Sequence, residues 1–353
     1  MRVRVLSKTD RQGPSSRYRF YQYGEALAAE GFQMEMAPLF GKVWFRLIRI
    51  RNRPIRIALK LPYVAWRFLI RLGSLLGAAR ADLVVVEHQL FPYLPGWLEV
   101  PLLSRLRPWI LEFDDAIYLT PFHRAKIAKL ASRADRVIVG NQFLARFAGE
   151  SGGTVSVIPT AVDPARFVPA PRRNASPVTP LVVGWIGLPC NLNALKLIEA
   201  PLRRLHRQTP MVLRILSAGP PPDLDLPVET EEWSEEAEAD WLREVQVGVM
   251  PLPDSDWSRG KCGLKILQFF AAGVPVVAAP SGVNGEIVRH GQNGFLAAND
   301  REWFEALERL AREPELRRRL GQAGRETVEA EYSVNRWTGQ IAELWRSTVG
   351  ART

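Results

Sequence analysis

Hydrophobic residues along this chain gather in short runs that alternate with longer stretches of helical spacing. The runs are rich in β-branched residues and are bounded by glycine, proline or polar residues, which is typical of parallel strands separated by helices. They form two series, at 2–7, 32–37, 83–87, 109–113, 136–139 and 155–159, and then at 181–187, 211–216, 245–250 and 276–279. The pattern therefore predicts an α/β protein with two parallel sheets.

A stretch without strand or helix periodicity separates the two series. Residues 163–180 contain five prolines, which indicates a linker. We therefore expect a Rossmann-like domain at 1–165, a linker at 166–180 and a second Rossmann-like domain at 181–335. The remaining residues, 336–353, are predicted to form a helix.

The composition fits a well-packed globular protein without a disulfide framework. Of the 353 residues, 47% are hydrophobic. Cys190 and Cys262 are far apart in the sequence, and the four histidines show no metal-ligand spacing. No apolar run reaches the roughly 18 residues that a membrane-spanning helix needs, and the first residues lack the apolar core of a signal peptide. We therefore expect a cytoplasmic protein that is soluble or peripherally bound to a membrane.

The positive charge of the chain is concentrated in one segment. The formal net charge is +10, and the window 36–81 holds ten basic residues and no acidic residue. The basic residues are Lys42, Arg46, Arg49, Arg51, Arg53, Arg56, Lys60, Arg67, Arg71 and Arg80. Aliphatic and aromatic residues, among them Trp44 and Trp66, lie between them. Segment 42–80 is therefore predicted to bind an anionic membrane surface, with apolar residues in the headgroup boundary and cations against the lipids.

Two other interpretations of segment 42–80 stay open. Its helices could belong to the N-terminal domain, with an apolar face in the core and a basic face in water. Nucleic-acid binding is disfavoured, because no nucleic-acid module is recognisable and the charge sits in an apolar-rich segment instead of lining a groove. The complete absence of acidic residues favours the membrane.

The stretch 258–296 carries the clearest functional signal. It is predicted to form a glycine-bearing loop, a helix from about residue 264, a buried strand at 276–279, a second loop at 282–285 and a second helix near Glu286. Two loops that lead into helix N-termini at the carboxyl ends of strands suit an anionic ligand, because free N–H groups and helix dipoles converge on it.

The same stretch resembles the donor-site segment of the retaining GT-B glycosyltransferases, group 1 (glycosyltransferase family 4-like), which use nucleotide sugars. The matching positions are Gly263-Leu264, Leu267, Ala271-Ala272-Gly273, Pro275-Val276-Val277, Gly282, Glu286 and the run from Gly291 to Leu296. The family's Glu-x7-Glu motif is degenerate, since Gly260 stands at its first position and Gln268 at its second. The resemblance implies a GT-B fold with two Rossmann-like domains facing a cleft, and a C-terminal helix at 336–353 that packs back on the first domain.

The resemblance also implies a binding site for a nucleoside diphosphate sugar in the second domain, beyond the carboxyl ends of its strands. We expect Arg259 and Lys261 to hold the diphosphate, although a solvated loop cluster is the alternative. Gln268 stands where relatives hold the ribose hydroxyls. The predicted donor-binding residues are Gly13, Gly187, Arg259, Lys261, Gly263, Lys265, Gln268, Gly282, Val283, Asn284 and Glu286.

Catalytic residues are expected in the first domain, at the end of the predicted strand 109–113. Many relatives carry a His-Asp pair there, and this chain has Asp114 and Asp115. A carboxylate at that place can orient the acceptor hydroxyl, stabilise an oxocarbenium-like charge or accept a proton. The alternative role is helix capping or loop hydrogen bonding. Glu87 and His88, which end a neighbouring strand, are weaker candidates.

The loop after the first strand, 12–17, resembles the family's N-terminal glycine loop. Its Gly13 allows a close backbone approach to the donor sugar and the acceptor. Arg17 and Arg19 follow it, and they could meet the phosphates of a lipid-linked acceptor or lie on the surface.

The sequence thus predicts a retaining hexosyltransferase, acting on a membrane-linked glycan or a surface-polysaccharide precursor at the inner face of the membrane. Its partners would be a nucleotide-sugar donor, a glycan or lipid-linked acceptor and the membrane surface, with no nucleic acid. No cofactor and no metal ion is expected. The alternatives are a catalytically silent membrane-associated scaffold with the same fold, supported by the degenerate motif, and a nucleotide-sugar epimerase or hydrolase.

Overall fold

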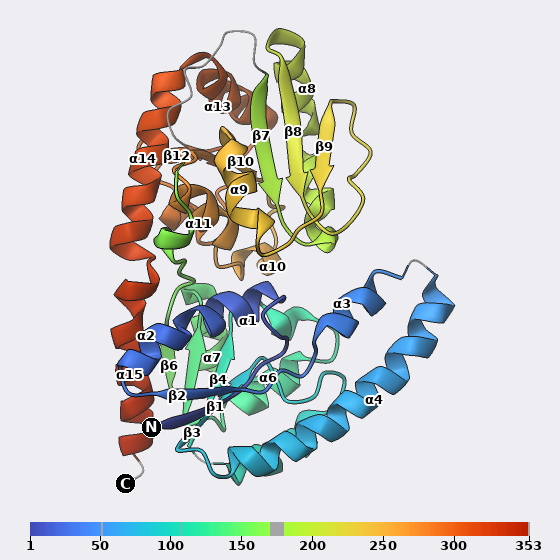
Figure 1. Ribbon diagram of the computed structural model, residues 1–353, viewed down its shortest axis with the longest axis vertical. Coiled ribbons are helices and arrows are strands. Elements are labelled where there is room, and N and C mark those ends of the chain that lie inside the picture. The colour runs from blue at the N-terminus through green and yellow to red at the C-terminus, as the bar shows by residue number, and fades with distance from the viewer. Residues whose placement is uncertain (51, 107, 170–179, 352–353) are drawn as a thin grey trace. The chain divides into compact units, whose positions relative to one another are not determined.

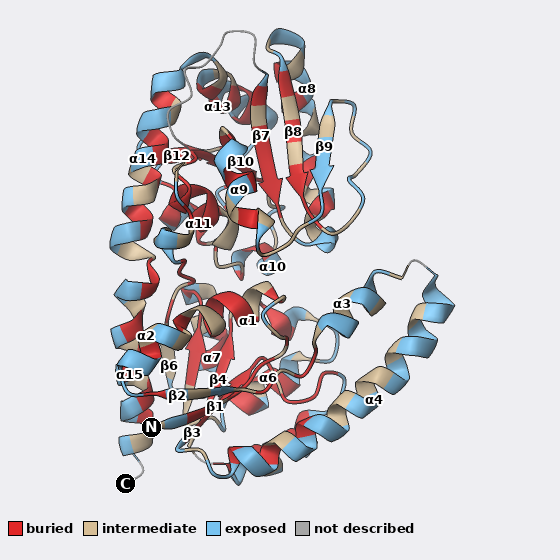
Figure 2. Ribbon diagram, viewed as in Figure 1, coloured by how far each residue is buried: buried red, intermediate tan, exposed pale blue. Residues whose placement is uncertain are grey.

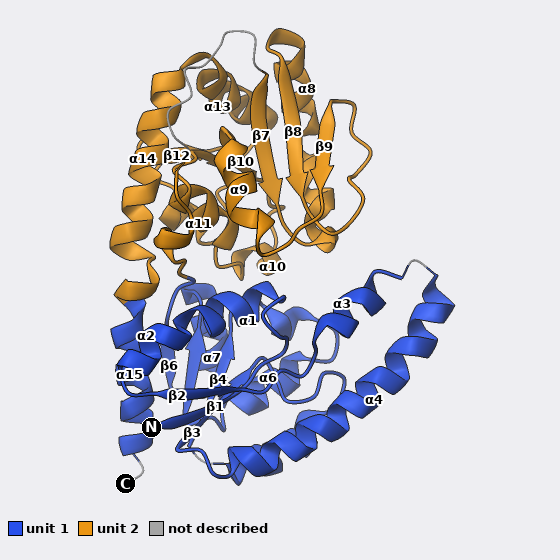
Figure 3. Ribbon diagram, in the orientation of Figure 1, with its two compact units in different colours: residues 1–160, 337–353 blue, residues 161–336 orange. Residues whose placement is uncertain are grey.

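The computed structural model describes residues 1–50, 52–106, 108–169 and 180–351. The chain divides into two compact units (Figure 3). Unit 1 comprises Met1–Thr160 and Trp337–Thr353, and unit 2 comprises Ala161–Arg336. Most of the predicted linker at 166–180 lies outside the described residues, as does Arg51 of the basic segment.

Unit 1 is built on a six-stranded parallel sheet with the order β2-β1-β3-β4-β5-β6 (Figure 1). The strands are β1 (Arg2–Leu6), β2 (Gln33–Met36), β3 (Leu83–Glu87), β4 (Trp109–Phe113), β5 (Arg136–Val139) and β6 (Val155–Val157). All residues of β3 and β4 are buried, as their continuous apolar runs predict for strands covered on both faces. The edge strand β2 alternates exposed and half-buried residues.

The helices of unit 1 differ from the sequence prediction in one region. The helix expected at 17–30 is broken into α1, a 3₁₀ turn and α2, because the backbone of Phe20 leaves the helical region. The helices of this unit are α1 (Pro14–Arg19), η1 (Tyr21–Tyr23), α2 (Gly24–Ala29), α3 (Lys42–Ile48), α4 (Arg53–Ala78), α5 (Gly96–Ser104), η2 (Ile117–Leu119), α6 (Arg124–Ala131), α7 (Gln142–Glu150) and α15 (Val334–Gly350).

The last helix, α15, begins in unit 2 and continues as part of unit 1. Its Trp345 packs edge-on against the ring of Phe32, with 5.4 Å between the ring centroids. Arg136 of β5 donates from Nε to Oγ1 of Thr348 at 3.1 Å. The predicted return of the C-terminal helix to the first domain is therefore present.

The helix α4 has 26 residues and corresponds to the larger part of segment 42–80. Figure 2 shows that its buried residues gather toward its C-terminal end, while exposed residues run along the rest. Arg71, only 2% exposed, donates to the carbonyl oxygens of Ala37 and Ser7 and so ties α4 to the carboxyl ends of β2 and β1. Among the helices of the described residues, none is both long enough and apolar enough to cross a bilayer.

Unit 2 contains a second six-stranded parallel sheet, with the order β12-β11-β10-β7-β8-β9. Its strands are β7 (Leu181–Ile186), β8 (Met211–Leu216), β9 (Val228–Glu231), β10 (Val247–Met250), β11 (Val276–Ala278) and β12 (Gly294–Leu296). The two outermost strands, β9 and β12, were not predicted from the sequence. In chain order this is the 3-2-1-4-5-6 arrangement of a dinucleotide-binding Rossmann sheet.

Helices and apolar side chains enclose this second sheet. The helices are η3 (Pro164–Arg166), η4 (Pro189–Ile198), α8 (Glu199–Gln208), α9 (Ala237–Glu244), α10 (Asp256–Arg259), α11 (Leu264–Ala271), α12 (Asn284–Ile287), α13 (Asp300–Arg312) and α14 (Pro314–Glu331). Trp185 of β7 and Phe269 of α11 are among the largest fully buried side chains. The predicted fold class, a two-domain α/β protein with Rossmann-like parallel sheets, is confirmed.

Candidate functional site

The sheet of unit 2 has a topological switch point between β7 and β10. These strands are neighbours, and the chain order of the sheet runs outward from them in opposite directions. Doubly wound sheets bind ligands beyond the carboxyl ends of the strands at such a point. The segments that leave these strand ends begin at Gly187 and at Pro251, and the segment after β11 begins at Ala279.

Lys265 places a cation at the end of β7. A Cβ atom on Gly187 would lie 2.7 Å from Cε and 2.8 Å from Nζ of Lys265, so the end of the lysine side chain lies directly against this glycine. The ammonium lies 4.4 Å from the centroid of the Trp185 ring, within reach of a cation–π interaction. Lys265 belongs to the first turn of α11 and is half-buried. The structure thus joins two predicted donor residues, Gly187 and Lys265.

The other two predicted cations lie on more exposed segments. Arg259 forms ion pairs with Asp254 at 3.0 Å and Asp256 at 3.1 Å, and its side chain is 47% exposed. The ammonium of Lys261 lies 5.1 Å from the centroid of the Trp257 ring. The charge of Arg259 is therefore partly balanced by two carboxylates.

Two glycines fix the loops around these cations. Gly263 and Gly282 have φ values of 71° and 57°, in the left-handed region that favours glycine. A Cβ on Gly282 would come within 3.0 Å of the backbone of Arg259, and one on Gly263 would come within 2.3 Å of Cδ1 of Ile287. The loop after β11 therefore lies directly against the end of α10.

That loop also carries buried polar groups. Asn284 is fully buried and donates from Nδ2 to the carbonyl of Ala279 at 2.9 Å, while its N–H donates to the carbonyl of Ser281 at 3.3 Å. The Oδ1 atom of Asn284 and the hydroxyl of Ser281 are buried without a hydrogen-bond partner among the described residues. Val283 is buried, and Glu286 is exposed in the four-residue α12.

Gln268, the residue at the second glutamate position of the degenerate motif, lies in α11. It is only 3% exposed. It follows Lys265 by one turn of that helix, so the two side chains share a face.

Unit 1 has its own switch point, between β1 and β3. The loop after β1 is held there by hydroxyl and carboxylate contacts. Ser16 hydrogen-bonds Thr9 through their hydroxyls at 2.7 Å and donates to the carboxylate of Glu87 at 2.6 Å. A Cβ on Gly13 would lie 1.8 Å from Oγ1 of Thr9, so this position needs glycine to pack on the loop. The close contact at Gly13 is thus a contact with Thr9 of the same loop.

The predicted catalytic residue Asp114 lies next to His88. The Nε2 atom of His88 is 3.3 Å from Oδ1 of Asp114, and the two side chains are 3% and 14% exposed. Burial by itself raises the pKa of Asp114, but the hydrogen bond and charge of His88, the charge of Arg19 and a hydrogen bond from Ser15 outweigh it and lower this pKa to about 2. Asp114 is therefore held as a carboxylate. Asp115 is half-buried, and its carbonyl accepts from the N–H of Ile117 at 2.7 Å.

His88 was only a weak candidate from the sequence. The register of the sheet pairs Glu87 with Glu112, so His88 and Asp114 follow neighbouring strand ends. If the predicted strands 83–87 and 109–113 are taken as parallel neighbours, the sequence places His88 near Asp114.

Arg17 and Arg19 lie in α1 and are buried, which overturns the surface interpretation. Arg17 is 3% exposed and Arg19 is 8% exposed. Arg19 donates to the carboxylate of Glu112 at 2.5 Å and to the carbonyl of Ile158 at 2.8 Å. Burial raises the pKa of Glu112 to about 7, against the opposing charge of Arg19. The end of this sheet therefore holds a buried cluster of acidic groups around Arg19 and His88.

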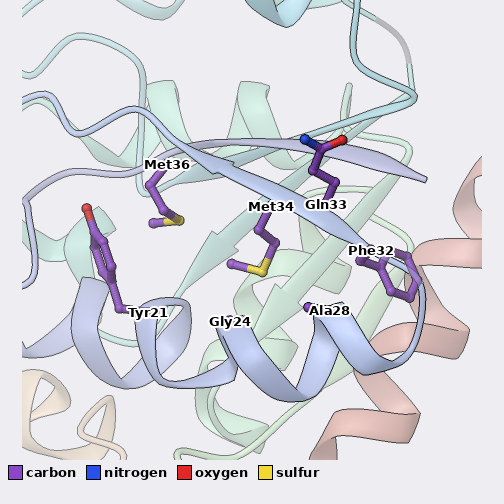
Figure 4. Close-up of a pocket in the computed structure, with 7 residues that line it drawn as sticks. All are labelled: Tyr21, Gly24, Ala28, Phe32, Gln33, Met34 and Met36. Carbon is purple, nitrogen blue, oxygen red and sulfur yellow. The ribbon is translucent and has the colours of Figure 1, made fainter.

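A shallow apolar groove of about 450 Å³ lies elsewhere in unit 1, between α2 and the edge strand β2 (Figure 4). Met34 and Met36 of β2 face Tyr21 and α2 across it. No predicted site residue lines it. Among the described residues, no three histidine, cysteine or acidic side chains are grouped to hold a metal ion.

Comparison with known proteins assigns a class to this fold. The chain is similar over its whole length to solved glycosyltransferase structures. These include sucrose-phosphate synthase from Thermosynechococcus elongatus, with 18% identity, a TM-score of 0.70, and 99% of this chain and 100% of that one covered. Anabaena Alr3699/HepE in complex with UDP-glucose has 16% identity, a TM-score of 0.71, and coverage of 98% and 100%. At this identity the likeness establishes the fold, which is that of two-domain GT-B proteins.

Unit 2 carries the match to a known protein family. Residues 180–313 match the family model of Glycosyl transferases group 1. The human alpha-1,3/1,6-mannosyltransferase ALG2 is 36% identical over 80 residues, which are 22% of this chain and 19% of that protein. The aligned segments span only 18% to 22% of the curated relatives' own length. The predicted resemblance to group 1 glycosyltransferases is confirmed.

Proposed function

We propose that this protein is a glycosyltransferase that moves a sugar from a nucleoside diphosphate sugar to an acceptor hydroxyl. The observation that carries the proposal is the position of Lys265. Its side chain lies against Gly187 at the end of β7, at the switch point of a dinucleotide-type sheet. A cation at that place suits the diphosphate of a donor. The family segment 180–313 includes this whole arrangement.

We assign the diphosphate first to Lys265, with Arg259 and Lys261 as further cations on the neighbouring loop. The half-buried position of Lys265 makes its charge more effective than that of an exposed side chain. The buried Ser281 hydroxyl and Asn284 Oδ1 offer polar partners that the protein itself leaves unused among its described residues. Gln268 is assigned to the ribose hydroxyls. These cations and dipoles are proposed to stabilise the leaving diphosphate without a metal ion.

We assign the acceptor to unit 1, with Asp114 as the catalytic carboxylate. A pKa near 2 makes Asp114 a weak base at neutral pH, since an effective general base has a pKa near the working pH. The low pKa instead favours a fixed negative charge that stabilises an oxocarbenium-like transition state. Retention at the anomeric carbon is proposed from the resemblance to retaining relatives.

A membrane-linked acceptor is proposed from the surface of α4. The exposed apolar side chains of this helix are Ile55, Ile57, Leu59, Leu61, Trp66, Leu69, Ile70, Leu72 and Leu76. Leu76 is 78% exposed and Leu69 is 67% exposed, and so many exposed apolar side chains on one helix are typical of an interaction surface. At about 1.5 Å per residue, the exposed apolar side chains from Ile55 to Leu76 form a strip about 32 Å long. Such a strip suits the headgroup boundary of a bilayer.

Most of the described basic residues of segment 42–80 fall into two groups, and the half-buried Arg56 instead donates to the carbonyl of Ile50 at 3.2 Å. Lys60, Arg67 and Arg71 turn toward unit 1, where they contact the Tyr93 hydroxyl and the carbonyls of residues 37–39 and 7. The exposed basic residues are Lys42, Arg46, Arg49, Arg53 and Arg80. They lie in α3 and near the two ends of α4, so we propose that they meet anionic headgroups around the apolar strip.

Calorimetric binding to a panel of nucleoside diphosphates and their hexoses, followed by product analysis, tests the proposal. We expect saturable binding of nucleotides with one particular base, and transfer of the hexose to a glycan or lipid-linked acceptor. NMR of the anomeric proton is expected to show the same anomeric configuration in the donor and the product. Turnover without an acceptor would favour a hydrolase or an epimerase. A folded protein that binds no nucleotide would refute the proposal and favour the silent scaffold.

A further inference from the structure

The segment between β3 and α5, residues 88–95, follows a backbone path that needs support. His88 and Tyr93 have φ values of 63° and 75°, which are uncommon for residues other than glycine. The N–H of Gln89 donates to the carbonyl of Glu87 at 2.7 Å and closes a three-residue turn around His88. Such conformations are energetically costly and persist only where the surrounding structure holds them.

A buried ion pair holds this segment. The carboxylate of Glu99 in α5 accepts the N–H groups of Leu90 and Phe91, each at 3.0 Å. The ammonium of Lys126 in α6 lies 2.6 Å from Oε1 of Glu99. It also donates to the carbonyls of Phe91 at 2.8 Å and Leu94 at 2.7 Å. Four backbone groups of the segment are therefore bound by two side chains that are 0% and 6% exposed.

The contacts of this pair account for all of its strong hydrogen-bonding groups. An ammonium has three N–H donors, and Lys126 uses them on one carboxylate and two carbonyls. Both oxygens of Glu99 accept from the segment's backbone. Gly96 lies against the Lys126 side chain, and a Cβ there would come within 3.3 Å of its Cγ. Apart from the bond between them, Glu99 and Lys126 direct their hydrogen bonds to the backbone of residues 88–95.

This arrangement matters for the site because His88 begins the same segment. His88 is joined to Asp114 through Nε2 at 3.3 Å, and its own N–H donates to the carbonyl of Glu112 at 2.7 Å. A buried ion pair does not by itself stabilise a fold more than well-packed apolar residues do. Its specific effect here is to fix the direction in which the chain leaves His88.

We propose that Glu99 and Lys126 are positioning residues that hold His88 against Asp114, and through His88 set the orientation of the Asp114 carboxylate. Only the expected change in kcat rests on the proposed function. The contact between His88 and Asp114 can be followed without any turnover.

The first test compares Glu99→Gln with the wild type in steady-state kinetics. The amide keeps the shape of the side chain but replaces one acceptor by a donor and removes the charge, so the segment loses part of its anchor. We expect kcat to fall about 10-fold to 100-fold, because a displacement of about 1 Å in a catalytic group has effects of that size. The KM for the nucleotide sugar stays within about 3-fold, since the donor is assigned to unit 2.

A matched control is Glu238→Gln in unit 2. Glu238 is 1% exposed, pairs with Arg166 at 3.1 Å and accepts from the Trp233 indole at 2.9 Å, so it too is a buried glutamate with an ion pair. We expect Glu238→Gln to lower stability comparably while kcat stays unchanged. Lys126→Arg retains the charge and some donors, and is expected to restore more of kcat than Lys126→Met.

The second test uses NMR of histidine-labelled protein, in which the chain's four histidines are observed and the His88 signal is assigned with His88→Gln. We expect Asp114→Asn to move the imidazole signal of His88 in the wild type, and to move it much less in the Glu99→Gln background. If Glu99→Gln does not fold, Lys126→Met is used in the same cycle.

An equal response of His88 to Asp114→Asn in both backgrounds would overturn the positioning role. An unchanged kcat in Glu99→Gln would overturn it as well. A wild-type protein that turns over no nucleotide sugar would instead refute the proposed function, and the NMR cycle would still decide the positioning role.

Discussion

The ends of the two sheets in this protein have the same topology class but differ in how their charged groups are held. In unit 1 the ends of β3 and β4 hold buried acidic groups that are paired with cations, Glu112 with Arg19 and Asp114 with His88. In unit 2 the corresponding strand end holds Lys265 against Gly187, with Arg259 and Lys261 on the adjoining loop. The cation of Lys265 favours an anionic ligand at the second. In the proposed function the nucleotide therefore binds unit 2, and the carboxylate of Asp114 in unit 1 acts on a developing positive charge.

The largest effect is expected from Asp114→Asn. Removing a fixed charge beside a developing oxocarbenium-like centre is expected to lower kcat about 100-fold or more. The affinity for a nucleoside diphosphate stays the same, because the diphosphate is assigned to the other unit. Steady-state kinetics together with calorimetry measure both quantities. A loss of nucleotide affinity in this variant would break the division of roles between the two sheets.

A somewhat smaller effect is expected from Lys265→Ala. Hydrogen bonds to a charged group contribute about 1.5–3 kcal/mol, so the Kd for the nucleoside diphosphate is expected to rise about 10-fold to 100-fold. Titration calorimetry measures it, with the exposed Lys129→Ala of α6 as the matched control. Equal affinities in the wild type and Lys265→Ala, with a loss in Lys261→Ala instead, would move the diphosphate to the exposed loop.

The next prediction concerns the outer surface of unit 1. Leu76→Ala on α4 is expected to weaken binding to vesicles that contain anionic lipid by about 10-fold, because a leucine side chain contributes about 1.5–3 kcal/mol when it leaves water. Leu197→Ala, a 49%-exposed leucine of unit 2, is the matched control. Sedimentation with vesicles measures both. Equal binding of the two variants would remove α4 from the membrane contact.

The smallest effect is a pH dependence of stability from Glu112. Its folded-state pKa of about 7 exceeds the ordinary value of 4.5, chiefly because of burial. Between these values the folded protein keeps a proton that the unfolded chain has lost, so this carboxyl's contribution to stability falls as the pH rises from about 4.5 to 7. The Glu112→Gln variant has no titrating carboxyl group at this position and therefore lacks this pH dependence. We expect its Tm, relative to that of the wild type, to rise steadily over that range. A constant difference in Tm would contradict the assignment.

The sequence predicted the buried parts of the fold better than its edges. Strands β3, β4, β5 and β8 begin and end as predicted, because short runs rich in apolar and β-branched residues mark them. The edge strands β9 and β12 are short and were missed, and β9 is largely exposed, so that no apolar run marks it. The break between α1 and α2 was also missed, because it depends on the backbone of Phe20 and not on a helix-breaking residue.

The candidate site was predictable where it depended on local chain geometry. The glycines at 263 and 282 have the positive φ values that such turn positions suggest. Contacts between distant segments were not predictable in the same way. The burial of Arg19 by Glu112 and the approach of His88 to Asp114 depend on the register of β3 and β4. The approach of Lys265 to Gly187 depends on how α11 packs against the neighbouring strands β10 and β11.

A crystal structure of the full chain with a bound nucleoside diphosphate is the most direct test of the division between the two sheets. The account predicts the diphosphate beyond the carboxyl end of β7, within hydrogen-bond distance of Nζ of Lys265. A diphosphate bound at the acidic end of the unit 1 sheet, or bound in unit 2 without contact to Lys265, would contradict it.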